Sequence, residues 1–314
     1  MDTTILIVTY KSQEAIYNCL DSINKKIPVV IVENSSDQNF KNKLEDKYLN
    51  VRCFLTNDNL GFANGNNFGL NLITTKYVFL LNPDTILESD TLDVLIASAK
   101  KIKNFALLAP ISSNDLNFGF FNNISKKKIE SIQEFFEVDY IKGFAMFFDK
   151  NKFINIGFFD PKIFIYFEEI DLCRRLKSIN EKIYLIPKAK ISHGGGKSHG
   201  NIFDIEMELS RNWHYMWSMF YYYNKHFGKI TAYKKTLNYF FLSFFKLIFY
   251  FFYNKKKYLI YKSRFLGLLN SYFGRVFINI YYRIGPVLSK VIKTNSFLFT
   301  ISKNIVLRLH KRIM

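Results

Sequence analysis

The stretch "YVFLLNPDT" (residues 77–85) decides the fold class of this 314-residue chain. A short apolar run, 77–81, is followed at once by a polar segment with a proline, which is typical of a strand buried on both faces. Comparable runs precede it: "ILIV" at 5–8, "VVIV" at 29–32 and "VRCFL" at 51–55. We therefore predict four strands in the first part of the chain.

Helical patterns separate these strands. Segment 12–23 places one apolar face on Ala15, Ile16, Cys19, Leu20 and Ile23. Ser12 is its predicted N-cap, and further helices are expected at 67–73 and 90–102. Strands that alternate with helices predict an α/β fold, with a mostly parallel sheet covered on both faces. In such sheets ligands bind beyond the carboxyl ends of the strands.

Polar residues stand at those strand ends: Thr9 and Tyr10 after the first, Glu33 after the second, and Asn82 and Asp84 after the fourth. The chain has neither a GxGxxG dinucleotide fingerprint nor a P-loop, so a bound phosphate would need another holder. A carboxylate together with diphosphate oxygens is a normal ligand set for Mg²⁺ or Mn²⁺. A plain Asn-Pro-Asp turn explains the same residues equally well.

Three further motifs carry candidate chemistry. "NLGFANGNNFGL" (59–70) is either a loop with an Asn helix cap or the border of a ligand site. "ISHGGGKSHG" (191–200) offers unhindered backbone N–H groups beside His193, which suits an anion or a metal; a structural histidine is the alternative. "FEEIDLCRRL" (167–176) is either an ordinary acidic helix start or an acid/base site.

Together, in this order, these motifs resemble the bacterial family 2 glycosyltransferases over about residues 3–200. The nearest resemblance is to the rhamnosyltransferase-like branch, which builds O-antigen and other surface polysaccharides. The resemblance implies a GT-A fold and an inverting transfer of a sugar from a nucleotide-diphosphate donor. It further implies that the donor is bordered by Thr9, Tyr10, Glu33, Asn59, Gly61, Phe62, Asn66 and Asn82.

The resemblance also implies the catalytic roles. Asn82 and Asp84 stand at the DxD-like metal motif, so Asp84 would hold Mg²⁺ or Mn²⁺ with His193 as a further ligand. The family places its general base at the second residue of an "ED" pair, here Glu169. The extra methylene of glutamate leaves Asp171 open as an alternative base. Glu168 would orient acceptor hydroxyls.

The charge of the chain lies in its last third. Of 44 Lys and Arg residues, 25 lie in segment 1–208 together with all 26 acidic residues, which leaves 44 − 25 = 19 basic residues and no acidic residue in 209–314. We predict a GT-A domain over 1–208 and a helical membrane-associating region over 209–314. "LNYFFLSFFKLIFYFFY" (237–253) carries one polar stripe: Tyr239, Ser243, Lys246, Tyr250 and Tyr253.

That segment is typical of a helix lying on an anionic membrane surface, and the aromatic density argues against nucleic acid as the partner. A helix packed on the catalytic domain and a membrane-spanning helix are the alternatives. Three scattered cysteines and the absence of a signal-peptide pattern fit a reducing cytoplasm. We expect a peripheral enzyme on the cytoplasmic face of the inner membrane.

The expected acceptor is a polyprenyl-linked glycan. Rhamnose is the favoured donor sugar, and a UDP-hexose or UDP-N-acetylhexosamine is the alternative. A non-catalytic membrane-tethered scaffold of the same fold is the rival from outside the enzyme class.

Overall fold

The structure is a computed structural model that describes residues 2–114, 116–121, 134–194 and 204–275. Residues 195–200 of the predicted His-Gly motif and the part of the predicted membrane-associating region beyond 275 lie outside these residues. The described residues up to Gly274 belong to one compact unit.

The first half of the sheet follows the predicted pattern. Four parallel strands lie in the order β3-β2-β1-β4, with β1 at Thr3–Thr9, β2 at Val29–Glu33, β3 at Val51–Leu55 and β4 at Tyr77–Leu81. Side chains alternate strictly across β1, where Ile5 and Ile7 belong to one hydrophobic core and Leu6 and Val8 to the other. Burial on both faces explains why the strand has no polar alternation.

The second half of the sheet is mixed. β10 (Ala145–Asp149) is antiparallel to β4 and β6 (Leu107–Ser112). β11 (Ile183–His193) runs parallel to β6 and antiparallel to β5 (Thr85–Leu87). Because β5 follows β4 directly and pairs with the end of β11, the polar segment after β4 meets residue 193. The short strands β7 (Phe118–Gly119), β8 (Phe136–Glu137) and β9 (Tyr140–Ile141) and the 3₁₀ helix η2 (Lys150–Phe153) complete this half.

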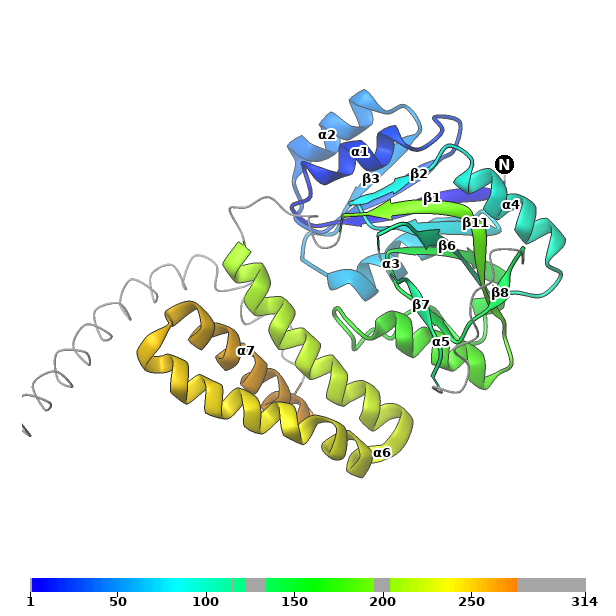
Figure 1. Cartoon of the computed structure of the whole chain (residues 1–314). Helices are drawn as coiled ribbons and strands as arrows, with labels where there is room; N and C mark the ends of the chain where they lie inside the picture. Colours follow the sequence, from blue (N-terminus) through cyan, green and yellow to red (C-terminus); the bar gives the residue numbers. More distant parts are fainter. Residues whose placement is uncertain (1, 115, 122–133, 195–203, 276–314) are drawn as a thin grey trace, which may run out of the picture. The chain divides into compact units, whose positions relative to one another are not determined.

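Helices cover both faces, as predicted (Figure 1). α1 (Ala15–Asp21), α2 (Gln38–Lys47) and α4 (Thr91–Lys101) pack on one core, and α3 (Gly61–Leu72) and α5 (Glu168–Ser178) on the other. The N-cap prediction for Ser12 is wrong. Glu14 holds the N-cap position of α1, and the Ser12 hydroxyl instead donates to the Tyr10 carbonyl at 3.2 Å.

The glycines of 59–70 lie on one face of α3, which begins six residues before the predicted start. A Cβ at Gly69 would lie 2.3 Å from Leu6 Cδ1, and one at Gly65 would lie 2.9 Å from Val8 Cγ1. Positions 61, 65 and 69 recur every four residues, so this bare stripe lets α3 approach the sheet closely. The interpretation of this segment as a loop is wrong.

A helical hairpin ends the described chain. α6 (Asp204–Tyr253) is interrupted at Gly228, whose φ of 79° is not helical, and α7 (Lys255–Tyr272) starts at the N-cap Asn254. α7 returns along α6: the Ser271 hydroxyl donates to the Trp217 carbonyl at 2.9 Å.

The polar stripe of 237–253 divides between the interior of the hairpin and its surface. Ser243 is buried, Lys246 donates to the Tyr261 hydroxyl at 3.1 Å, and the Tyr250 ring stacks on that of Tyr261 of α7. Tyr239 and Tyr253 are 42% and 75% exposed, and large apolar side chains of the helix are exposed as well.

Candidate active site

The ends of β1 and β2 are joined by a buried carboxylate. Glu33 is fully buried and accepts hydrogen bonds from the Thr9 hydroxyl and from the N–H of Ser35, the latter at 2.7 Å. Burial raises the pKa of Glu33. Thr9 and Glu33, both predicted to border the donor, therefore lie at the expected edge of the sheet, but their side chains are buried. Tyr10, which follows Thr9, is partly exposed.

The start of α3 is docked onto the chain that leads to α5. The Phe62 N–H donates to the Phe164 carbonyl at 2.8 Å, and Asn59 Oδ1 accepts from the Gly61 N–H at 2.9 Å. Gly61 has a φ of +76°, and a Cβ there would lie 2.5 Å from the Phe164 carbonyl oxygen, so glycine is required. Asn66 is buried, and its Nδ2 donates to the Phe62 carbonyl.

Asn34, which the sequence did not single out, ties this corner together. Its Nδ2 donates to the Gly61 carbonyl at 3.0 Å, and its Oδ1 accepts from Thr56 Oγ1 at 3.1 Å. Asn34 follows Glu33 in the polar run 33–37, and this position after a strand was the one feature of the sequence that could have indicated its role.

Asp84 and His193, predicted as metal ligands, lie together. His193 is paired with Thr85 across β11 and β5, and its Nε2 lies 3.5 Å from Asp84 Oδ1. The Gly194 N–H donates to the Asp84 carbonyl at 2.9 Å. Both side chains are largely buried, at 4% exposure for Asp84 and 11% for His193. A carboxylate beside an imidazole fits a divalent cation whose remaining ligands come from a diphosphate, although the described residues contain no group of three or more His, Cys, Asp or Glu around one point.

The turn between β9 and β10 connects this pair with the predicted base. The Phe144 ring stacks on the His193 ring with centroids 4.0 Å apart, and the Phe144 carbonyl accepts from the Asn82 N–H at 2.9 Å. A Cβ at Gly143 would lie 3.6 Å from Glu169 Cβ. One short turn thus lies close to Glu169 at Gly143 and packs on the His193 ring through Phe144.

Glu168 and Glu169 begin α5 after two residues in the left-handed region, Tyr166 and Phe167, each with a φ of 68°. This conformation is strained for aromatic residues and is characteristic of functional sites. Within the described residues, the Oε2 atoms of both glutamates are buried without a hydrogen-bond partner. Burial raises the pKa of Glu169 to about 6, and burial together with the neighbouring Glu169 charge raises that of Glu168 further above its usual range.

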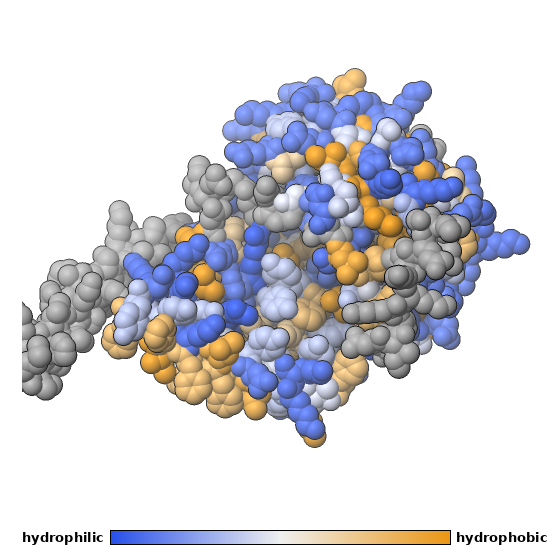
Figure 2. Space-filling view, in the orientation of Figure 1, coloured by the Kyte–Doolittle hydropathy of each residue, from blue (hydrophilic) through white to orange (hydrophobic). Residues whose placement is uncertain are grey.

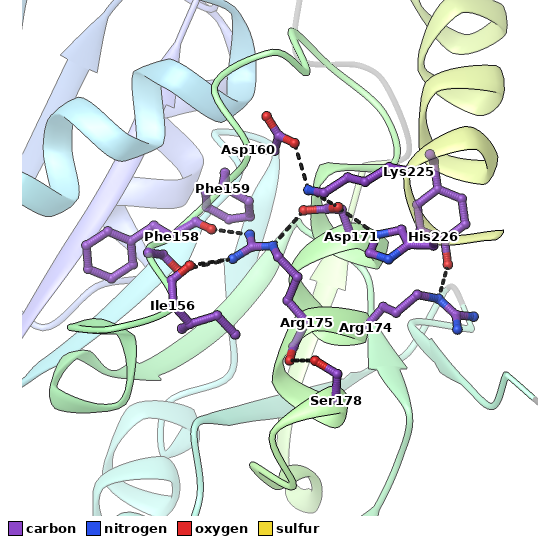
Figure 3. A network of polar contacts seen from close by, with 12 residues as sticks. Ile156, Phe158, Phe159, Asp160, Asp171, Arg174, Arg175, Ser178, Lys225 and His226 are labelled. Atoms are coloured by element: carbon purple, nitrogen blue, oxygen red, sulfur yellow. Dashed lines mark hydrogen bonds and ion pairs between the residues drawn. The ribbon is translucent and has the colours of Figure 1, made fainter. Parts of the chain in front are cut away.

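Asp171 has a different environment, shown in Figure 3. Its side chain has no exposed surface, and its oxygens lie 2.8 Å from Arg175 Nε, 2.6 Å from Lys225 Nζ and 2.8 Å from His226 Nε2. Burial opposes ionisation, but the His226 and Lys225 hydrogen bonds and the Arg175 charge lower the pKa of Asp171 to about 2. This is the arrangement of a structural ion-pair network.

The first half of α6 holds the segment that carries the glutamates. The Ser218 hydroxyl donates to the Ile165 carbonyl at 3.0 Å, and the His214 ring stacks on Phe164 at 4.4 Å. The Tyr215 ring contacts both Tyr166 and Phe167. These contacts brace the strained turn, and nothing in the sequence pattern indicated them.

The glycosyl transferase family 2 model matches residues 4–173, a span that runs from β1 through the glutamates of α5. The chain belongs to glycosyl transferase family 2. Among family relatives, the chain is 23% identical over 258 residues to rhamnosyltransferase WbbL of Escherichia coli K12, covering 73% of this chain and 97% of WbbL. It is 26% identical over 198 residues to the low-salt glycan biosynthesis hexosyltransferase Agl10 of Haloferax volcanii, covering 58% of this chain and 64% of Agl10.

Solved structures confirm the GT-A fold of this family 2 chain. The mannosyltransferase PcManGT of Pyrobaculum calidifontis superposes with a TM-score of 0.51 at 12% identity, covering 86% of this chain and 72% of that one. GalNAc-T7 superposes with a TM-score of 0.51 at 14% identity, covering 61% and 42%. S. aureus TarS 1-349 reaches 0.50 at 12% identity, covering 88% and 92%.

Proposed function

We propose that this family 2 glycosyltransferase is an inverting, metal-dependent enzyme that moves a sugar from a nucleotide-diphosphate donor to a hydroxyl of a lipid-linked glycan. The observation that carries the proposal is the turn at Gly143 and Phe144, in which Gly143 lies close to Glu169 and the Phe144 ring stacks on His193. The reaction needs a proton acceptor and a group that binds the leaving diphosphate, both near the sugar–phosphate bond. The turn lies next to a candidate for each, Glu169 and His193.

Glu169 is the proposed general base. Its buried, unpartnered Oε2 is suited to accept a hydrogen bond from the acceptor hydroxyl and to take that proton as the oxygen attacks the anomeric carbon. Attack opposite the leaving diphosphate inverts that carbon. Glu168, whose pKa is raised well above its usual value, keeps its proton and donates to the acceptor. Asp171 already accepts from three partners, so we favour Glu169.

Asp84 and His193 would hold the Mg²⁺ or Mn²⁺ ion, with Asn82, Tyr10, Asn59 and the start of α3 bordering the donor. When bound, such an ion neutralises the charge that develops on the leaving diphosphate. Two structures of similar fold, GalNAc-T7 with UDP and PcManGT with GDP-Man, were solved with Mn²⁺. These likenesses support the choice of ion and of donor class.

Asp84→Asn should weaken donor binding about tenfold or more in Mn²⁺ and leave the weak binding in EDTA unchanged, because the amide keeps the shape but loses the charge that holds the cation. Calorimetry with UDP, GDP and dTDP, each with and without Mn²⁺, measures this. Asp93→Asn, an exposed aspartate on α4, is the matched control. If the parental protein binds none of the nucleotides with Mn²⁺, the scaffold alternative replaces the enzyme.

Rhamnose is the proposed donor sugar because a relative matched over 97% of its length is a rhamnosyltransferase. A UDP-hexose or UDP-N-acetylhexosamine is the alternative. Following donor hydrolysis by ¹H NMR across dTDP-rhamnose, UDP-glucose and UDP-N-acetylglucosamine distinguishes them.

The proposed location is the cytoplasmic face of the inner membrane, with 209–314 as the membrane-associating region. Figure 2 shows apolar surface gathered over the helical hairpin. In the second half of α6 large apolar side chains are exposed: Phe241, Leu242, Phe245, Ile248, Phe249 and Phe252. α6 is also the one helix in the described residues that is long and apolar enough to cross a membrane. Because α7 covers the middle of its polar stripe at Lys246 and Tyr250 and adds basic residues at 255–257, we favour a helix lying on an anionic surface.

Replacing Phe245, Phe249 and Phe252 together with Ser should abolish co-sedimentation with vesicles that contain anionic phospholipid, since each buried Phe contributes about 1.5–3 kcal/mol. Nucleotide binding should stay unchanged, which serves as the folding control. An oligonucleotide shift assay tests nucleic acid as the alternative partner of this basic region. Equal sedimentation of the triple variant and the parent would exclude this face as the membrane contact.

A further inference from the structure

A cavity of about 390 Å³ lies between α5, α6 and strand β9. Aromatic rings from four separate parts of the chain form its walls, among them Phe121, Tyr140, Phe167 and Phe227. None of the lining residues that the structure describes is acidic. The proposed reaction assigns no role to this space, although Phe167 immediately precedes the two glutamates.

Two cations line the same cavity, Arg174 from α5 and Lys235 from α6. The Arg174 guanidinium is held in place: its Nε donates to the Tyr222 hydroxyl at 2.6 Å, and it lies over the Phe121 ring at 4.0 Å. Lys235 is exposed. A fixed guanidinium fork and an exposed ammonium, without a carboxylate among the described lining residues, favour a phosphorylated ligand.

The cavity lies beside the segment that carries the proposed base. Phe167 and Ile170, which flank the two glutamates, both line it. Arg174 follows Glu169 by five residues, which is about 7.5 Å along the axis of α5 and about 140° around it at 3.6 residues per turn. Ile170 lies between them on the helix surface, so a ligand held at Arg174 would approach Glu169 around the side of α5 that Ile170 occupies.

The exposed apolar face of α6 lies on the same side of the helix as the cavity. Positions 235, 242 and 249 are seven residues apart and so lie on one side of the helix. Lys235 lines the cavity, whereas Leu242 and Phe249 are 47% and 58% exposed. An apolar chain leaving the cavity would thus pass directly onto the surface that we propose contacts the membrane.

We propose that this cavity binds the diphosphate and the first isoprenoid units of a lipid-linked acceptor, an inference that rests on the proposed function. Arg174 and Lys235 would bind the diphosphate, and the aromatic walls would bind the adjoining isoprenoid chain. The occupant is a lipid diphosphate, because a free phosphate leaves the aromatic walls unused and an uncharged lipid leaves the cations unused.

Calorimetry of the full chain with farnesyl diphosphate as the probe tests this assignment. We expect Lys235→Gln and Arg174→Gln each to weaken binding about tenfold, as for loss of a hydrogen bond to a charged group. Thr231→Trp, which fills the cavity without changing its charge, should abolish binding. Lys234→Gln is the matched control, since the neighbouring lysine does not line the cavity, and should bind like the parent.

Three outcomes would overturn the proposal: pyrophosphate or farnesol binding as tightly as farnesyl diphosphate, no effect of Lys235→Gln, or an equal effect of Lys234→Gln. Nucleotide binding in Mn²⁺ is measured on the same samples. If the parental protein does not bind nucleotide, the proposed transferase is contradicted. If the parental protein binds nucleotide but not farnesyl diphosphate, only the proposed acceptor cavity is contradicted. Because Lys235 is exposed, its variant remains informative even if Arg174→Gln fails to fold.

Discussion

Glu169→Gln should reduce sugar transfer by about 10²–10⁴-fold while donor binding stays near the parental value. The amide has the same shape as the carboxylate but cannot take the proton of the attacking hydroxyl. Folding should be preserved, since removing a buried charge whose pKa is already raised takes away an unfavourable group. Initial-rate measurements at saturating donor, with calorimetry on the same protein, separate transfer from binding.

The pH dependence provides a second measure of the same role. A base works only when it is deprotonated, so the parental rate should fall about tenfold per pH unit below about pH 6, where burial places the pKa of Glu169. A rate that is unchanged down to pH 4, or a Glu169→Gln variant with the parental rate, would contradict Glu169 as the base.

Asp171→Asn should instead destabilise the protein by about 3–5 kcal/mol, because it removes the buried carboxylate shared by Arg175, Lys225 and His226 and takes from the largely buried Arg175 its ion-pair partner, whereas Lys225 keeps Asp160. We expect a melting temperature lower by about 6–10 °C, measured by calorimetry. Asp93→Asn, exposed on α4, should melt like the parent.

The stability loss should depend on pH with a defined sign. The pKa of Asp171 is lowered in the folded protein to about 2, so its contribution is fully present above about pH 4, the ordinary range of an aspartate, and is lost as the pH falls towards 2. The variant and the parent should therefore converge in stability at low pH. A variant that melts like the parent but transfers no sugar would show that Asp171 is the base after all.

Much of this could be predicted from local sequence. The strands at 29–33, 51–55 and 77–81 follow from apolar runs that end in polar residues, since a strand buried on both faces must be apolar along its length. Glycines in the 59–70 segment were visible as a repeat, but a loop and a close-packed helix share that composition. Only the contact with Leu6 decides between them.

The sequence by itself determined the α/β fold, the family and the polar residues at the strand ends, because these depend on short apolar runs and on motifs in register. The tertiary structure decided what each acidic residue experiences. Glu169 and Asp171 are two positions apart, yet a helix turns them to different neighbours, one toward Gly143 and the other toward Lys225 and His226 of α6. These α6 residues lie over 50 residues away in the chain, so no local pattern could assign the pKa values that distinguish a general base from a structural carboxylate.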